Sequence, residues 1–123
     1  MEEILDQEKH AYKLNVFEGP LELLLHLVKK NKVSIYDIPI ADILDQYLEY
    51  MELCQQYNAE LSSEFIVMAA ELLYIKSKML IPRNEEIEEE DPRMDLAKRL
   101  AEYQKMKICF PKYNFDMYLR KYW

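Results

Sequence analysis

Few residues in this 123-residue chain have the types and spacing that catalysis or metal binding requires. The two histidines, His10 and His26, are too few for a zinc site without carboxylate or thiolate help, and His26 lies among leucines. The two cysteines, Cys54 and Cys109, form no Cys-x-x-Cys pair, and the metalloprotease, nucleophile-elbow and glycine-loop motifs are missing from the sequence. We therefore expect a protein that is not an enzyme and that uses no metal and no cofactor.

The densest cluster of ionisable residues is acidic. It consists of Glu85, Glu86, Glu88, Glu89, Glu90 and Asp91, with no basic residue among them. Such a run repels itself and is more typical of a solvated linker than of a metal site, which predicts a linker over residues 83–91. The formal net charge of the chain is −7, and most of it comes from this run. The remainder offers no basic face for phosphates, so we expect contact with DNA only through other proteins.

The composition favours helices as the elements that position the other residues. Gly19 is the only glycine, whereas turn-rich β folds need many residues that tolerate positive φ. Pro20 and the Ile38-Pro39 pair suit the first turns of two helices, and apolar residues follow each of them at helical spacing. We expect an all-α protein with a small three-helix domain in residues 1–82. Unpaired thiols and the lack of a signal or membrane-spanning segment predict a cytoplasmic location.

A third helix, expected over residues 62–81, is apolar around most of its circumference. Ser62 is a suitable cap for its first turn, and Pro82 ends it. One broad face contains Leu61, Phe65, Met68, Leu72, Ile75 and Met79; two further stripes contain Ile66, Leu73 and Leu80, and Val67, Tyr74 and Ile81. Two preceding helices cannot cover all of these faces, and an exposed apolar patch of this size is unusual in a monomer. Either a fourth helix or the tail covers the remainder, or a partner helix does; the spacing alone favours neither.

Two segments follow the acidic run. Asp91 and Pro92 predict the start of a helix over residues 92–107, whose apolar side carries Leu96, Leu100 and Tyr103. This helix is either a separate docking segment or an ordinary fourth helix packed on the first three. Residues 108–123 form a tail rich in aromatic and basic residues, a composition also found in segments that contact membranes or single-stranded nucleic acid. Because the tail lacks an amphipathic period, we expect no membrane contact.

Three stretches of the sequence resemble one family. FEGPLELLLHLVKKNKVSIYDIPIADILDQYL at residues 17–48 looks like the opening of the bacterial kleisins called segregation and condensation protein A. ELSSEFIVMAAELLYIKSKMLIP at residues 60–82 is similar to the third helix of that family, and EEDPRMDLAKRLAEYQKMK at residues 89–107 continues the pattern. The resemblance covers the N-terminal half of the family pattern, roughly residues 12–107.

The resemblance implies a non-catalytic adaptor of a condensin-like complex that takes part in chromosome segregation and condensation, associated with the nucleoid. In this family the N-terminal domain binds the coiled-coil neck of a structural maintenance of chromosomes ATPase, and the middle segment binds a dimer of segregation and condensation protein B. The implied neck-binding residues lie on the third helix, on one of two stripes: part of the broad face with Phe65, Met68, Leu72, Ile75 and Met79, or the stripe with Val67 and Tyr74. The spacing does not show which of the two stripes faces the domain's own core. The implied residues for the second partner are Leu96, Leu100 and Tyr103.

The end of the sequence departs from the family pattern. Residues 108–123 do not resemble the polar helical continuation, and we expect the chain to end before the C-terminal winged-helix domain of the family. An alternative interpretation is a self-associating helical bundle whose aromatic tail touches a membrane, outside any such complex.

Overall fold

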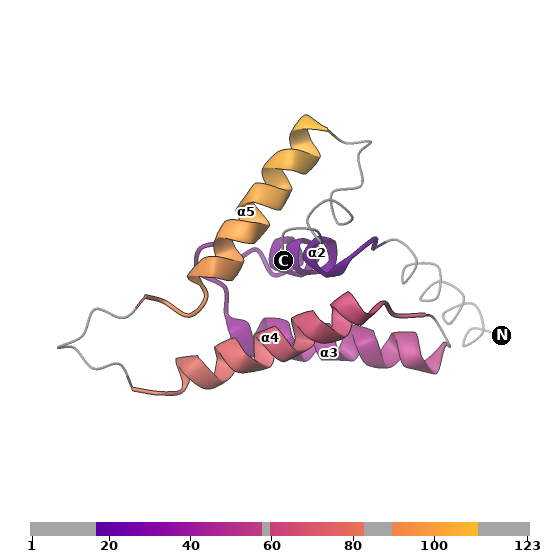
Figure 1. Ribbon diagram of the computed structural model, residues 1–123, viewed down its shortest axis with the longest axis horizontal. Coiled ribbons are helices and arrows are strands. Elements are labelled where there is room, and N and C mark those ends of the chain that lie inside the picture. Colours follow the sequence, from indigo (N-terminus) through magenta and orange to yellow (C-terminus); the bar gives the residue numbers. More distant parts are fainter. Residues whose placement is uncertain (1–16, 58–59, 83–89, 111–123) are drawn as a thin grey trace.

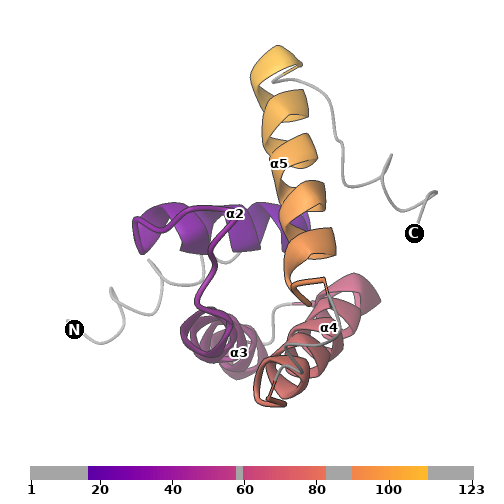
Figure 2. The ribbon, with the colours of Figure 1, turned by 90° about the vertical axis from the view of Figure 1, so that its left-hand side faces the viewer.

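The computed structural model describes residues 17–57, 60–82 and 90–110, and these residues form four helices and no strand. The helices are α2 (Pro20–Lys30), α3 (Ile40–Gln56), α4 (Ser63–Met79) and α5 (Met94–Cys109). Helices α3 and α4 run antiparallel, side by side, in one layer, and α2 crosses above that layer (Figures 1 and 2). Helix α5 packs on α2 and extends away from the layer. The all-α class expected from the sequence is confirmed.

Helix α2 is the central element of the core. Pro20 occupies its first turn, as expected, and the Glu18 N–H donates to a carboxylate oxygen of Glu22 over 3.0 Å. At the other end, Asn31 Nδ2 donates to the Leu27 carbonyl, and the Asn31 and Gln46 side-chain amides exchange two hydrogen bonds of 2.9 Å. These bonds join the end of α2 to α3. The buried residues of α2 lie around most of its circumference: Pro20, Leu21, Leu23, Leu24, Leu25, Leu27 and Val28.

Helix α3 carries the expected amphipathic stripe. Ile40, Leu44, Tyr47 and Cys54 are buried, while the Met51 side chain is partly buried at the edge of the core. The Tyr47 hydroxyl donates a 2.7 Å hydrogen bond to the Phe65 carbonyl, in the first turn of α4. Because that hydroxyl is desolvated and close to Tyr50 and Cys54, its pKa lies above the ordinary tyrosine value. The bond fixes the position of α4 along α3.

Helix α4 is two residues shorter at its C-terminal end than expected. It ends at Met79, and its C-cap Leu80 still has helical backbone angles. Ile81 directly precedes Pro82, and a residue in that position disfavours helical backbone. Ser62 is the N-cap residue, but its side chain makes no capping hydrogen bond; its carbonyl accepts from the Phe65 N–H over 3.1 Å instead. The expected hydroxyl cap was therefore wrong, although the helix start was correct.

Helix α5 begins two residues later than predicted. The Asp91 carboxylate accepts a 2.9 Å hydrogen bond from the Arg93 N–H, so Asp91 to Arg93 form a turn before the helix. The Arg93 guanidinium also donates to Asp37 and to the Ile38 carbonyl, at 3.1 and 2.8 Å. These bonds anchor the start of α5 to the α2–α3 connection. In the structure this segment forms a fourth helix that packs mainly on α2, which is one of the two roles considered for it.

Several sequence expectations fall outside the described residues. They concern most of the acidic linker, residues 83–89, and the aromatic tail from residue 111 onward. In the part of the chain that the structure describes, none of the helices is long and apolar enough to cross a membrane.

Candidate interaction surface

The reactive side chains do not form a catalytic constellation in the described residues. His26 contacts the Phe17 ring, with 5.0 Å between ring centroids. Cys54 is buried and Cys109 exposed, and burial raises the pKa of the Cys54 thiol. No group of His, Cys, Asp and Glu side chains among residues 17–57, 60–82 and 90–110 is arranged to hold a metal ion.

The broad face of α4 packs inside the protein. Phe65, Met68, Leu72 and Ile75 are at most 5 % exposed and belong to the same core cluster as α2 and α3. Met79, the last residue of this face, is 42 % exposed because it lies at the helix end. Of the two stripes that the sequence left open for a partner, four members of the broad one are therefore occupied by the protein's own core.

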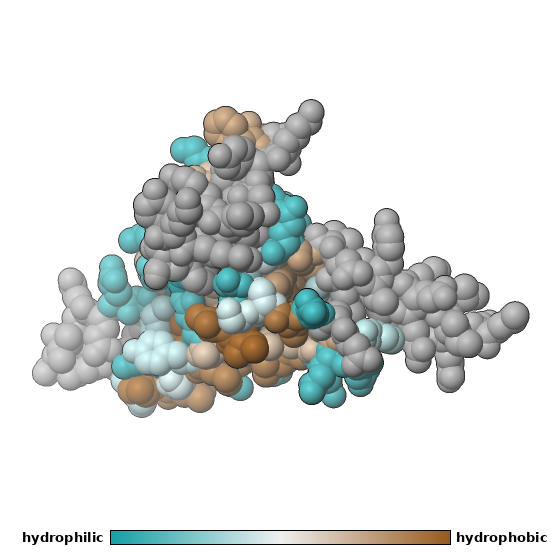
Figure 3. Space-filling view, turned by 45° about the vertical axis from the view of Figure 1, so that its right-hand side comes forward, coloured by the Kyte–Doolittle hydropathy of each residue, from teal (hydrophilic) through white to brown (hydrophobic). Residues whose placement is uncertain are grey.

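The opposite side of α4 is exposed and apolar; we call it the outer face. Val67 and Tyr74 lie on it, with 55 % and 61 % of their surface exposed. The other large apolar side chains of this face are more than half exposed as well: Ile66, Leu73, Leu80 and Ile81. Figure 3 shows apolar side chains gathered along the α3–α4 layer. A helix whose outer face is this apolar is normally covered by another protein or by a membrane.

A shallow groove continues the outer face toward α3. Its volume is about 410 Å³, and its apolar lining comes from Leu48 and Met51 of α3, Leu61 before α4, and Ile66 of α4. Glu52 and Gln55 form its polar edge. Sequence patterning did not single out this groove, because its lining combines residues from two helices. Leu48, four residues after the core residue Leu44, was the available signal.

The other edge of the outer face is charged. Glu71 forms an ion pair with Arg99 of α5, and Arg99 also lies 3.1 Å from Asp95. Burial lowers the pKa of the Arg99 guanidinium. Lys78 lies over the Tyr74 ring, with its ammonium 5.6 Å from the ring centroid. The outer face is thus apolar in its centre and on its groove side, and ionic on its α5 side.

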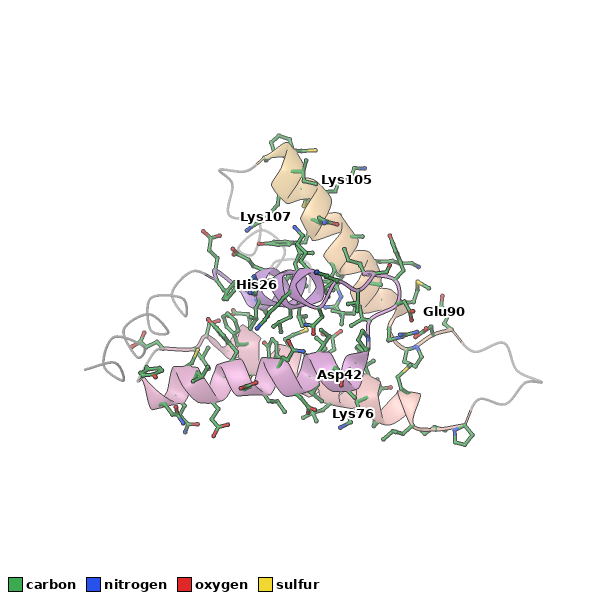
Figure 4. All side chains as sticks on the ribbon, turned by 180° about the vertical axis from the view of Figure 1, so that it is seen from behind. His26, Asp42, Lys76, Glu90, Lys105 and Lys107 are labelled. Atoms are coloured by element: carbon green, nitrogen blue, oxygen red, sulfur yellow. The ribbon has the colours of Figure 1, made fainter. Side chains whose placement is uncertain are left out.

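The three α5 residues assigned to a second partner lie inside the protein. Leu96, Leu100 and Tyr103 are at most 1 % exposed, packed in the core that includes α2. Lys107, labelled on α5 in Figure 4, pairs with Glu22 of α2 at 3.0 Å and lies over the Tyr103 ring. The side chains expected to bind the second partner are therefore buried in this structure, because the apolar side of α5 packs on α2.

A family model described as segregation and condensation protein ScpA matches residues 27–112, which include all of α3, α4 and α5. This chain belongs to the ScpA family. Segregation and condensation protein A of Thermoanaerobacter sp. (strain X514) is 54 % identical over an alignment of 102 residues, and the alignment covers 78 % of this chain and 42 % of the relative. The Bacillus subtilis (strain 168) protein of the same description is 48 % identical over an alignment of 107 residues, and the alignment covers 81 % of this chain and 43 % of that protein. The chain spans about two fifths of the length of these ScpA relatives.

Proposed function

We propose that this ScpA-family chain acts in chromosome segregation and condensation as a non-catalytic adaptor. Its outer face on α4 binds the coiled-coil neck of a structural maintenance of chromosomes ATPase. The observation that carries this proposal is the exposed stripe containing Val67 and Tyr74, which the four described helices leave uncovered. Of the seven side chains first assigned to this interface, these two and Met79 are the ones at the surface.

The geometry supports a helical partner. The outer face runs along the full length of a 17-residue helix, or about 25 Å at 1.5 Å per residue. An apolar helix face of that length pairs most readily with another helix through side chains at regular spacing. The adjoining groove toward α3 widens the surface beyond one helix, as a two-helix neck requires.

A binding measurement with the purified neck fragment, by calorimetry or interferometry, tests this function. Tyr74→Glu and Val67→Glu should each weaken binding at least tenfold, because each places a charge in an apolar interface. Glu49→Lys, on the exposed side of α3, is the control and should bind as the wild-type chain does. Unchanged binding in both α4 variants would exclude the outer face as the neck site.

We also propose that α5 supplies Leu96, Leu100 and Tyr103 to a dimer of segregation and condensation protein B. Since these side chains are buried beside α2, this binding requires α5 to leave α2 first. The measured affinity is then lower than the intrinsic affinity by the fraction of molecules with α5 released. Lys107→Glu, which removes the ion pair with Glu22, should increase the affinity for this partner about two- to fivefold. The paired variant Glu22→Lys with Lys107→Glu should restore the original affinity.

A further inference from the structure

Acidic side chains border the groove between α3 and α4. Four exposed acidic residues lie on α3, which contains no lysine or arginine: Asp42, Asp45, Glu49 and Glu52. Asp45 lies three residues before Leu48 and Glu52 four residues after it, so both flank this groove residue on the helix surface. The groove therefore combines an apolar lining with a negatively charged edge, and it suits an occupant with aromatic and basic side chains.

The last described residues lie at the same end of the molecule as this groove. Lys107 of α5 pairs with Glu22, in the first turn of α2, at 3.0 Å. Just before α2, the Phe17 ring packs edge-on against Tyr50 of α3, with 5.5 Å between ring centroids. Met51, which lines the groove, directly follows Tyr50. The start of α2 thus contacts both the end of α5 and the half of α3 that lines the groove (Figure 1).

The residues that follow α5 have the composition that suits the groove. Residues 118–123 read YLRKYW, in which Arg120 and Lys121 stand between aromatic residues. Aromatic side chains bury a large apolar area, and basic side chains are attracted to the carboxylates at the edge. Residues 111–123 span about 43 Å when extended, at about 3.3 Å per residue. Helix α3 is about 25 Å long at 1.5 Å per residue, so the segment is long enough to reach the groove from the end of α5.

We propose that residues 118–123 bind in the groove between α3 and α4 of the same chain. Their aromatic rings lie against Leu48 and Ile66, and their basic side chains lie beside Asp45 and Glu52. The segment thereby covers an apolar surface that the four described helices leave open. A partner that uses the groove has to displace this segment first, which lowers the affinity of that partner.

The fluorescence of Trp123 tests this contact in the full chain, because Trp123 is the only tryptophan. Acrylamide should quench Trp123 about threefold less efficiently in the folded chain than in the same chain unfolded in urea, since the groove shields the indole ring. Ile66→Glu places a charge in the groove and should raise quenching to the unfolded level. Tyr36→Glu, at an exposed aromatic residue outside the groove, is the matched control and should leave quenching unchanged. Circular dichroism verifies that each variant is folded.

A charge exchange tests the acidic edge separately. Glu52→Lys places a positive charge beside Arg120 and Lys121 and should increase quenching of Trp123 about twofold. Combining Glu52→Lys with Arg120→Glu and Lys121→Glu should restore the shielding. Glu102→Lys, at an exposed position of α5, is the control for the charge change and should have no effect.

Four results would overturn this contact. Trp123 of the folded wild-type chain could be quenched as efficiently as in the unfolded chain, which would mean that the segment is not shielded. Shielding that survives both Ile66→Glu and Glu52→Lys would place the segment outside the groove. Shielding that is lost on dilution would assign the groove to the segment of a second copy, and shielding that requires vesicles of anionic phospholipid would assign the segment to a membrane. The test uses this chain alone, so its outcome is independent of the neck site.

Discussion

At the scale of single residues, adjacent positions in one helix have opposite environments. Val67 is 55 % exposed, whereas the next residue, Met68, is completely buried. Their types are both apolar, so composition does not distinguish them. The difference comes from the 100° rotation between successive residues, which turns one side chain to α2 and α3 and the other outward.

Truncation of these two neighbours should therefore have very different effects on stability. Met68→Ala leaves a cavity in the core and should lower the free energy of unfolding by about 2–4 kcal/mol. Val67→Ala removes an exposed side chain and should change it by less than about 0.5 kcal/mol. Urea denaturation of the two variants measures both values. Equal losses would mean that α4 is rotated relative to the arrangement described.

The buried hydroxyl of Tyr47 provides a second test. Tyr47→Phe keeps the ring but leaves the Phe65 carbonyl without this donor, and should cost about 1–2 kcal/mol of unfolding free energy. Tyr36→Phe, at a tyrosine that is 61 % exposed, is the matched control and should be neutral. The comparison is made by urea denaturation at one pH.

The thiols should differ in reactivity, and Cys54 should contribute to the pH dependence of stability. Burial raises the pKa of the Cys54 thiol, so the unfolded chain ionises at lower pH than the folded one. The contribution of the Cys54 thiol to stability is fully present below the unfolded thiol pKa of about 8.5 and is lost as pH rises through the folded value.

At pH 8 a thiol reagent should react rapidly with exposed Cys109 and with Cys54 only on unfolding. A Cys109→Ser chain that still reacts rapidly would contradict this assignment.

At the scale of elements, local sequence signals predicted where the helices lie better than they predicted which helix faces are buried. Prolines at 20 and 39 and the apolar periodicity gave helix positions within about two residues, because these signals act on the backbone nearby. Which stripe of α4 faces inward could not be predicted, since that depends on where α2 and α3 lie. The same reason applies to α5: its amphipathic pattern suits a docking segment and a fourth helix equally.

Arg99 links α5 to α4 through its ion pair with Glu71, and it also pairs with Asp95 within α5. Arg99→Ala should lower the free energy of unfolding by about 1–3 kcal/mol, because Glu71 is partly buried and loses a charged partner. Lys98→Ala, on the exposed side of the same turn, should have little effect. Hydrogen exchange should locate the change in α5, with α3 amides unaffected. Equal acceleration in α3 and α5 would instead show that the four helices unfold as one unit.

At the scale of the whole molecule, the architecture divides its apolar surfaces between two uses. The core takes the stripes that face α2, including the apolar side of α5, whereas the residues of the outer face of α4 are exposed. The surplus of apolar faces was evident from the sequence, and the structure shows that α5 does not cover it. The sequence pattern of α5 could not show this, because two apolar surfaces with similar chemistry, on α2 and on α4, were available to it.

The position of α5 also has a mechanical consequence. A pull on the chain beyond Cys109 acts at the end of α5 that carries Lys107, while Arg93 holds the other end against Asp37 and the Ile38 carbonyl. Tension applied there would first break the contact between Lys107 and Glu22 and then peel α5 from α2, one turn at a time, toward the anchored start. Helices α2, α3 and α4 would keep their packing during this extension. Helix α5 would thus detach from α2 under tension before the force reaches the outer face of α4.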